Sequence, residues 1–458
     1  MGHRMPAIKE TALPFVNEVS LYVGELDRAT HIEGASKMAL ETMKARTTLP
    51  EQGIPAPDLW ETMDGEAGAD VRWQDGRVAA LVYLAGEDVY EVAKTAYLRA
   101  FSGNGLAPSA FPSLKRYETE VVEMTAGLLN APRGMGNITS GGTESILLAV
   151  KIARDRARVR QPHVTRPHIV LPETAHPAFN KAAHYFGLDI TRTPVGADYR
   201  VDIDAYRNAI TDNTVLLVGS APNYVYTMID PIPELSELAR ERDISFHVDA
   251  CVGGFFLPFV EKLGYDIIPF DFRNPGVTTI SADLHKFGYT AKGASTLTCR
   301  DEEIYQYQAF AFSEWPGGTY LTPTLTGTRP GGAIAAAWAV MNYLGEAGYL
   351  RLTQQTMDFM RRLRADIEAI PDLYVVGEPD MSLIAFGSDA VDIVAVGDGM
   401  QARGWMVYLE RVPPSIHLML SPGHEPFLDG YLSDLREVVE LVRAGKIVRQ
   451  RDELKYGQ

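Results

Sequence analysis

The feature that most constrains the fold is a regular alternation of two patterns between Met135 and Arg300. Short apolar runs rich in β-branched residues are followed by segments whose apolar residues recur three and four positions apart, as in an amphipathic helix. Alternating strands and helices imply parallel strands, right-handed crossovers and an α/β sheet covered by helices on both faces. The predicted strands are His168–Leu171, Thr214–Val218, Ile244–Val248 and Val277–Ser281, and the predicted helices are Pro177–Phe186, Ile203–Ile210 and Pro233–Arg242.

The pattern changes after Gly332. Two long helical segments, 333–344 and 349–370, precede short strands at 373–376 and 416–420, which indicates a smaller α+β domain. A chain of 458 residues is too long for one core of ordinary size, so we expect two or three domains. The expected parts are an N-terminal arm or cap at 1–80, a large α/β domain at 81–335 and a small C-terminal domain at 336–458.

Charge and cysteine content exclude several classes of protein. The net charge of −16 argues against a nucleic-acid partner, because phosphate backbones need a dense positive field. With only two cysteines, Cys251 and Cys299, a disulfide framework is not expected and a reducing cytoplasm fits. The sequence shows neither a signal peptide nor 18 consecutive apolar residues, so we expect no transmembrane segment, and no metal site is predicted.

A glycine pair precedes a predicted helix in Thr139-Ser-Gly-Gly-Thr-Glu144, followed by the helical pattern 145–158. Glycines let the backbone approach an anion closely, and the free N–H groups and dipole of a helix start hold a phosphate. An ordinary capped helix is an equally good interpretation of these residues taken alone. The motif has the spacing of neither a dinucleotide fingerprint nor a P-loop.

Three polar residues follow predicted strands, where ligands gather in open α/β sheets. His176 could lie flat on an aromatic ring, although a lone histidine is more often structural. Asp249 ends an apolar strand and needs a cationic partner, which a protonated pyridine nitrogen or an arginine could supply; alternatively it is a capping aspartate. Lys286 closes another apolar strand, where desolvation would lower its pKa and make it a nucleophile for a carbonyl; alternatively it reaches solvent.

Together the four features favour pyridoxal 5'-phosphate (PLP) as the cofactor. A phosphate clamp, a stacking histidine, a carboxylate for the ring nitrogen and a buried lysine occur in the order that a PLP fold requires. We therefore expect Lys286 to carry the cofactor as a Schiff base and Asp249 to keep the ring positively charged.

The sequence resembles the group II PLP-dependent decarboxylase superfamily and, within it, is most similar to the sphingosine-1-phosphate lyases. The resemblance extends from about Asp75 to His417. Its motifs are Asp75–Val78, Val82-Tyr83, Phe111–Lys115, Thr139–Ile146, Ala182–Gly187, His247–Phe255, His285-Lys286, Lys292-Gly293, Gly327–Gly332 and Pro413–His417.

The resemblance implies a fold-type I enzyme, that is, a mostly parallel central sheet with helices on both faces and a smaller α+β C-terminal domain. It also implies a homodimer with active sites at the subunit interface. The implied catalytic residues are Lys286, Asp249 and His176. The implied cofactor-binding residues also include Gly142, Thr143 and His285, with Thr328 coming from a partner subunit.

In the lyases, the residues that match Tyr83 and Lys292, together with a histidine shortly before the Phe-Pro motif, are expected to bind the substrate phosphate. This chain has Ala107 at the position of that histidine. It also reads Pro222-Asn-Tyr-Val-Tyr226-Thr where the lyases carry a Pro-Gln-Phe-Pro-His-Gly-like run. Both departures concern substrate recognition, and neither changes the predicted cofactor residues.

Three functions stay open at this point. The favoured one is cleavage of the Cα–Cβ bond of a phosphorylated amino alcohol, in which a base takes the proton of the β-hydroxyl group. The second is decarboxylation of an amino acid, for which the missing histidine is no loss. The third is a cofactor-binding homologue without catalytic activity, against which the intact Lys286 and Asp249 argue.

Overall fold

The structure is a computed structural model that describes residues 48–450 of the chain. Its contacts divide the chain into two units, residues 1–72 and residues 73–458. The described part of the first unit contains one helix, α3 (Ala56–Ala67), with Asp58 in its first turn, where a carboxylate favours the helix dipole. Most of the arm predicted for residues 1–80 lies outside the described residues, and the three-part division of the chain stays a proposal.

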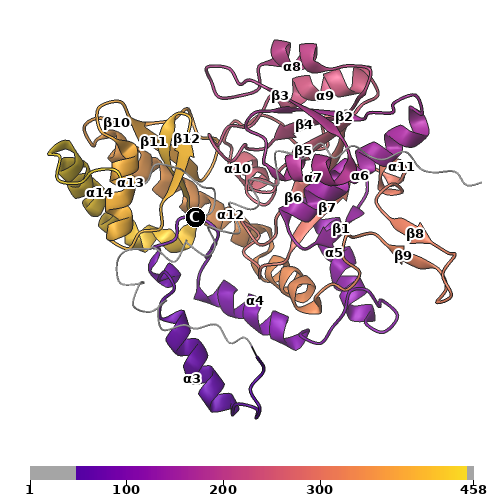
Figure 1. Ribbon diagram of the computed structural model, residues 1–458, viewed down its shortest axis with the longest axis horizontal. Coiled ribbons are helices and arrows are strands. Elements are labelled where there is room, and N and C mark those ends of the chain that lie inside the picture. The colour runs from indigo at the N-terminus through magenta and orange to yellow at the C-terminus, as the bar shows by residue number, and fades with distance from the viewer. Residues whose placement is uncertain (1–47, 451–458) are drawn as a thin grey trace, which may run out of the picture. The chain divides into compact units, whose positions relative to one another are not determined.

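The second unit contains a seven-stranded sheet with the strand order β1-β7-β6-β5-β4-β2-β3 (Figure 1). Neighbouring strands are parallel from β3 to β6, whereas β7 is antiparallel to both β6 and β1. The predicted α/β fold with a mostly parallel sheet is therefore confirmed. The strands are β1 (Met135–Thr139), β2 (His168–Pro172), β3 (Asp189–Thr193), β4 (Thr214–Ser220), β5 (Ser245–Asp249), β6 (Val277–Ala282) and β7 (Ser295–Cys299).

Helices cover both faces of this sheet, which explains why its central strands are almost continuously apolar. On one face, Ile146 of α6 packs with Leu171 of β2. On the other face, Leu235 of α9 packs with Phe246 of β5. The helices of these layers are α6 (Gly142–Arg160), α7 (Ala178–Phe186), α8 (Ile203–Ala209), α9 (Ile232–Glu241) and α10 (Leu257–Lys262).

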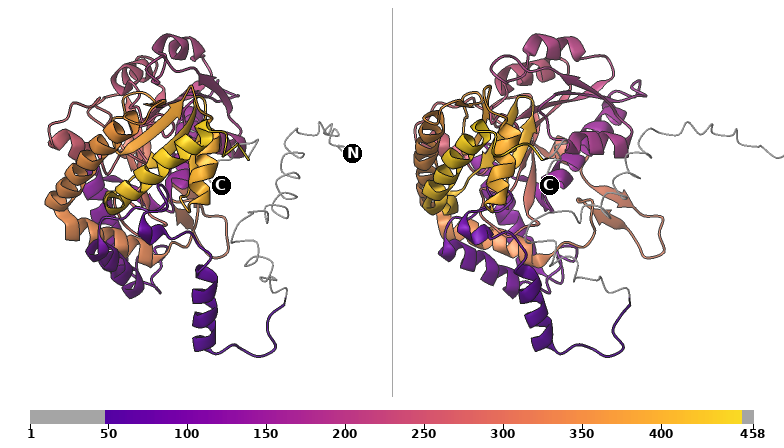
Figure 2. Two further views of the ribbon diagram at one scale, coloured as in Figure 1. Left: turned by 90° about the vertical axis from the view of Figure 1, so that its left-hand side faces the viewer. Right: turned by 60° about the vertical axis from the view of Figure 1, so that its left-hand side comes forward.

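A second, antiparallel sheet of four strands has the order β10-β11-β13-β12. Helices α13 and α14 lie side by side against it, as both views of Figure 2 show. This smaller α+β part of the chain follows the large sheet in sequence, as predicted. Its elements are β10 (Leu373–Val375), β11 (Leu383–Ser388), α13 (Ile393–Ala402), β12 (Tyr408–Arg411), β13 (Pro414–Met419) and α14 (Leu428–Arg443).

The long helix α12 (Gly331–Glu368) joins the two sheets and breaks its helical geometry at Gly345, where φ is 54° and ψ is −175°. Glycine adopts this left-handed backbone without a Cβ clash, which is why the sequence pattern indicates two helices here. Of the described helices, none is both long and apolar enough to cross a membrane. The remaining elements are η1 (Trp73–Asp75), α4 (Glu87–Arg99), α5 (Pro112–Leu128), α11 (Glu302–Tyr305), β8 (Phe310–Phe312), β9 (Tyr320–Thr322) and η2 (Pro422–Phe427).

The fold brings several polar loops to one edge of the large sheet. The strands β2, β4, β5 and β6 are parallel, so their carboxyl ends lie at the same edge. The start of α6, which follows β1, reaches this edge as well, because residues Gly141 and Gly142 line a cavity together with residues that follow the parallel strands. Ligands in open α/β sheets bind at such an edge.

Candidate active site

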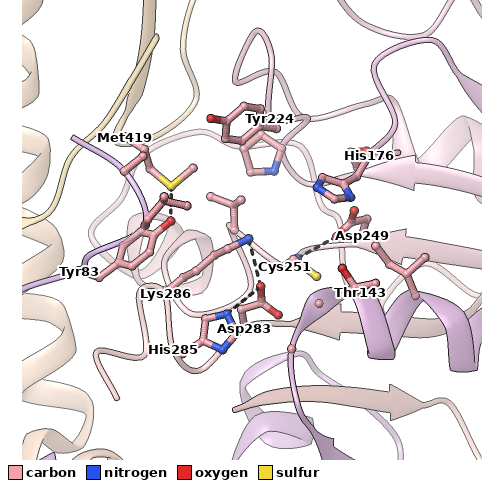
Figure 3. A pocket seen from close by; sticks show the side chains of 18 of the residues that line it. Tyr83, Thr143, His176, Tyr224, Asp249, Cys251, Asp283, His285, Lys286 and Met419 are labelled. Atoms are coloured by element: carbon pink, nitrogen blue, oxygen red, sulfur yellow. Dashed lines mark hydrogen bonds and ion pairs between the residues drawn. The ribbon is translucent and has the colours of Figure 1, made fainter. Parts of the chain in front are cut away.

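A cavity of about 360 Å³ opens at the carboxyl edge of the large sheet. This volume lies in the range of small-molecule and cofactor sites. Met419 of the small sheet closes one side of the cavity (Figure 3). Seven of the nine residues predicted for the site line it, namely Tyr83, Gly142, Thr143, His176, Asp249, His285 and Lys286.

The amino end of α6 forms one wall of the cavity, and no side chain caps it. The first N–H groups of a helix have no partner within the helix, so those at Gly142 and Thr143 are available to an anion. A Cβ atom at Gly142 would lie 2.7 Å from the sulfur of Cys251 and 3.0 Å from an oxygen of Asp283. The close approach of the backbone to these side chains therefore requires glycine.

Asp249 is the last residue of β5, and 8% of it is exposed. Its Oδ1 accepts hydrogen bonds from the backbone N–H of Cys251 at 3.1 Å and from the hydroxyl of Ser281 at 3.2 Å. Within residues 48–450, no lysine or arginine forms an ion pair with this carboxylate. The arrangement holds the carboxylate in a fixed orientation and fits a cationic partner supplied by a ligand.

His176 follows β2 and lies close to Asp249 in the cavity (Figure 3). Its Nδ1 accepts a hydrogen bond from the backbone N–H of Ala178 at 3.1 Å, which leaves the hydrogen of the neutral ring on Nε2. Burial lowers the pKa of His176 and outweighs the opposing effect of the Asp249 carboxylate. A neutral, fixed imidazole of this kind is suited to stack on an aromatic ring.

Lys286 lies in the turn that follows β6, with its ammonium nitrogen 3.0 Å from Oδ2 of Asp283. Burial by itself lowers the pKa of Lys286, but the carboxylate of Asp283, with smaller contributions from Tyr83 and Cys251, raises it more, so the pKa lies well above its usual value. The lowered pKa expected from the sequence is therefore wrong for the protein without a ligand. The reason is a carboxylate three residues earlier that desolvation alone did not take into account.

Tyr83 lines the cavity, whereas Lys292 does not. The nitrogen of Lys292 lies 4.9 Å from the centre of the Tyr83 ring and donates a hydrogen bond to the carbonyl of His285 at 3.1 Å. Loss of hydration and the nearby charge of Lys286 lower the pKa of Lys292 to about 8. Lys292 thus lies next to Tyr83 without lining the cavity, and its role with substrate stays a prediction.

Thr328 is also absent from the lining of this cavity. Its hydroxyl accepts a hydrogen bond of 3.4 Å from the amide of Asn104. The sequence predicts that Thr328 belongs to the active site of a partner subunit. Its absence from the cavity of its own chain agrees with that prediction but does not test it.

Asp283 and Tyr224 are two polar residues among the cavity-lining residues that were not predicted from the sequence. Asp283 pairs with Lys286, and the ring of Tyr224 lies tilted against the buried His417 ring, with ring centres 4.4 Å apart. The position of Asp283, three residues before Lys286, could have indicated its role, because a tight turn brings such residues together. Tyr224 lies in the segment where the sequence departs from the lyase pattern, so the resemblance offered no role for it.

The donor set fits a phosphate-bearing pyridine aldehyde. The cavity offers a helix start for a phosphate, a neutral histidine for a ring face, a carboxylate without a protein cation and an amine for an aldehyde. These groups approach the cavity from different strands, and Figure 3 shows them facing one another across it.

Comparison with known proteins gives the same picture. Residues 68–388 match the family described as the pyridoxal-dependent decarboxylase conserved domain. Sphingosine-1-phosphate lyase of Arabidopsis thaliana is 45% identical over 405 residues, which covers 86% of this chain and 74% of that protein. A probable L-aspartate decarboxylase of Pyrococcus abyssi is 32% identical, covering 85% of this chain and 99% of that protein.

A solved structure of sphingosine-1-phosphate lyase from Burkholderia pseudomallei superposes with a TM-score of 0.84 at 40% identity, covering 89% of this chain and 95% of the other. The resemblance drawn from motifs and the fold-type I architecture are thereby confirmed. The cofactor is pyridoxal phosphate, and the chain is a PLP-dependent lyase. The chain belongs to the pyridoxal-dependent decarboxylase family.

Proposed function

We propose that this enzyme cleaves the Cα–Cβ bond of a phosphorylated amino alcohol and releases an aldehyde and an aminoethyl phosphate. One observation carries the proposal. Lys286, Asp249 and His176 face one cavity in a chain that is 45% identical to a sphingosine-1-phosphate lyase over most of its length.

The proposed roles follow from the positions of the side chains. Bound PLP withdraws electrons from the α-carbon of an attached amine, so that one bond to this carbon can break. Lys286 supplies the amine that holds the aldehyde carbon, and Asp249 keeps the ring nitrogen protonated. His176 covers a face of the ring, while Gly142, Thr143 and His285 hold the phosphate at the start of α6.

The substrate decides which bond breaks, because the same cofactor residues serve both lyases and decarboxylases. A lyase needs cations or donors for the substrate phosphate, and Tyr83 with Lys292 are the candidates. Ala107 has no donor to offer at the position where the lyases carry a histidine. The segment from Pro222 to Thr227 contributes Tyr224 to the cavity in place of the lyase pattern.

Amino-acid decarboxylation is the second candidate function. Two observations favour it: Ala107 replaces the phosphate-binding histidine, and Lys292 lies outside the cavity wall. The 32% identity to a probable L-aspartate decarboxylase over nearly all of that protein shows how closely the two activities are related in sequence. In this alternative, the same site would break the bond from Cα to the carboxylate.

We also propose that the enzyme is a cytoplasmic homodimer with shared active sites. Exposed apolar side chains on the β8–β9 hairpin, which projects from the sheet in Figure 1, support association between subunits: Phe310, Phe312, Trp315 and Leu321. Thr328 follows this hairpin and would reach the neighbouring site.

Product analysis distinguishes the candidate functions. The purified holoenzyme is incubated with sphingosine 1-phosphate and, separately, with a panel of amino acids including aspartate and glutamate. A long-chain aldehyde from the first supports the lyase, whereas carbon dioxide from the second supports the decarboxylase. Bound cofactor without turnover of any amine would indicate the non-catalytic homologue.

Replacing Lys292 by alanine is expected to raise KM for phosphorylated amino alcohols about tenfold or more. The reason is the loss of a charge-assisted hydrogen bond, which contributes roughly 1.5–3 kcal/mol. KM for free amino acids should change little. In the wild type, KM for the phosphorylated substrate should also rise above pH 8, where Lys292, with a pKa of about 8, loses its positive charge.

Lys181→Ala is a matched control for this experiment, because Lys181 is exposed and its nitrogen also lies over a tyrosine ring, 5.6 Å from the centre of Tyr185. It should leave both KM values unchanged. Equal effects of Lys292→Ala on both substrate classes would remove Lys292 from phosphate recognition.

Gly142→Ala is expected to weaken cofactor binding about tenfold or more. The new methyl group would meet the sulfur of Cys251 and the carboxylate of Asp283, so the start of α6 or these side chains must shift. Titration of the stripped protein with PLP, followed by absorbance, measures the change. Gly127→Ala is the control, since no atom lies within 4 Å of its Cβ position; unchanged affinity in Gly142→Ala would contradict the proposed phosphate site.

A further inference from the structure

Asp283 lies between Lys286 and the predicted phosphate cradle, which consists of Gly142 and Thr143 at the start of α6 together with His285. It follows β6, and 3% of it is exposed. A Cβ atom at Gly142 would be 3.0 and 3.1 Å from its two oxygens, so the carboxylate lies against the amino end of α6. Its Oδ1 has no hydrogen-bond partner within residues 48–450. A buried carboxylate in this position needs a positive charge nearby.

Lys286 is the residue that supplies this charge. Its nitrogen is 3.0 Å from Oδ2 of Asp283, whereas Nε2 of His285 is 3.5 Å from the same oxygen. Burial lowers the pKa of His285 to about 4 even though Asp283 favours its charged form, so His285 is neutral at pH 7. In the ligand-free protein, the pair therefore consists of an ammonium at Lys286 and a carboxylate at Asp283.

This pair conflicts with the chemistry of cofactor capture. The nitrogen of Lys286 must lose a proton to the solvent before its lone pair can attack the aldehyde carbon of PLP. A carbon–nitrogen bond then forms, the aldehyde oxygen leaves as water, and no oxidant or reductant is needed. A nearby carboxylate favours the protonated lysine and slows the first step at neutral pH.

We propose that Asp283 is a positioning residue that holds Lys286 as an ammonium in the cofactor-free protein and thereby sets the pH at which the protein captures PLP. Asp283 acts through Lys286 and not on the cofactor. The inference rests on the proposed role of Lys286 in attaching the cofactor.

Other groups that face Lys286 favour its charged form less than Asp283 does. The thiol of Cys251 is kept neutral by burial, which raises its pKa well above the usual value. The hydroxyl of Tyr83 donates a hydrogen bond to the sulfur of Met419. Lys292, His285 and His176 oppose a charge on Lys286 or are neutral. Asp249, the last residue of β5, accepts hydrogen bonds from Cys251 and Ser281 instead. Only Asp283 pairs directly with the ammonium among the described residues.

The test measures capture of the cofactor by the full-length protein after the cofactor has been removed. Stripped wild type and Asp283→Asn are mixed with saturating PLP between pH 6 and pH 10, and the rise of the imine absorbance gives the rate. We expect the midpoint of the rate profile to fall by about one pH unit or more in Asp283→Asn, which makes capture about tenfold faster at pH 7.

Pyridoxal without its phosphate gives a second measurement. Removal of Asp283 also removes an anion from the phosphate cradle, which should lower the half-saturating concentration of PLP but not of pyridoxal. The midpoint shift, in contrast, should appear with both aldehydes, because it reports the proton on Lys286. A shift seen with PLP alone would overturn the proposal.

Three further variants complete the test. Lys286→Ala should give no imine signal, and a signal that persists would refute the role of Lys286 itself. An unshifted midpoint in Asp283→Asn refutes only the role of Asp283. Asp271→Asn removes another buried, ion-paired carboxylate and should leave the midpoint in place. If Asp283→Asn does not fold, Asp283→Glu replaces it in the test, because glutamate keeps the negative charge. A midpoint of the rate profile near that of the wild type agrees with the proposal, and a midpoint about one pH unit lower contradicts it.

Discussion

Lys286→Ala is expected to abolish covalent attachment of PLP and all measurable turnover. Lys286 is the amine that faces the cavity across from Asp249 (Figure 3), while Lys292 lies next to the Tyr83 ring and does not line the cavity. Without an amine at position 286, borohydride has no carbon–nitrogen double bond to reduce, so mass spectrometry should find no cofactor mass on the protein. The phosphate cradle, His176 and Asp249 remain, so non-covalent binding should persist at reduced affinity.

The alanine variant also leaves Asp283 buried without its cation, which costs roughly 3–5 kcal/mol of stability. Lys286→Arg separates this loss from the chemistry, because arginine keeps the positive charge and does not form the adduct. Lys292→Ala should retain the reducible adduct. An adduct that survives in both Lys286 variants would show that another residue carries the cofactor.

Much of the large sheet could be predicted from sequence, because the apolar pattern of each strand and helix is a local property of the chain. The strands predicted at 168–171, 214–218, 244–248 and 277–281 agree with β2, β4, β5 and β6 to within two residues at each end. The antiparallel insertion of β7 between β6 and β1 was not predicted. Pairing over more than a hundred residues leaves no trace in the periodicity of a single strand.

The candidate site could likewise be predicted only in part. His176 and Lys286 follow buried strands and Asp249 ends one, so the topology alone places them at one edge. The protonation of Lys286 could not be predicted in this way, since it depends on a 3.0 Å contact with Asp283 that only the folded turn creates. Lys292 and Thr328 were assigned by resemblance, and their distance from the cavity of their own chain depends on loop geometry.

Asp249→Asn is expected to lower kcat about a hundredfold or more while leaving the cofactor covalently bound. The asparagine oxygen can still accept the hydrogen bonds from Cys251 and Ser281, so the local geometry is preserved. The negative charge is lost, however, and a neutral amide does not stabilise a protonated pyridine nitrogen. Removal of one preorganised electrostatic partner from a transition state costs about 10²–10³ in kcat.

The size and kind of this loss separate an electronic role of Asp249 from a structural one. Lost stabilisation of the transition state lowers kcat and kcat/KM together, whereas a distorted pocket raises KM and loosens the cofactor. Ser281→Ala removes one of the two donors that orient the carboxylate but keeps its charge, so its effect should be several-fold only. If Asp249→Asn instead keeps kcat within about threefold of wild type, the carboxylate does not control the protonation of the ring nitrogen. Another group must then stabilise the electron-withdrawing ring on which both candidate reactions depend.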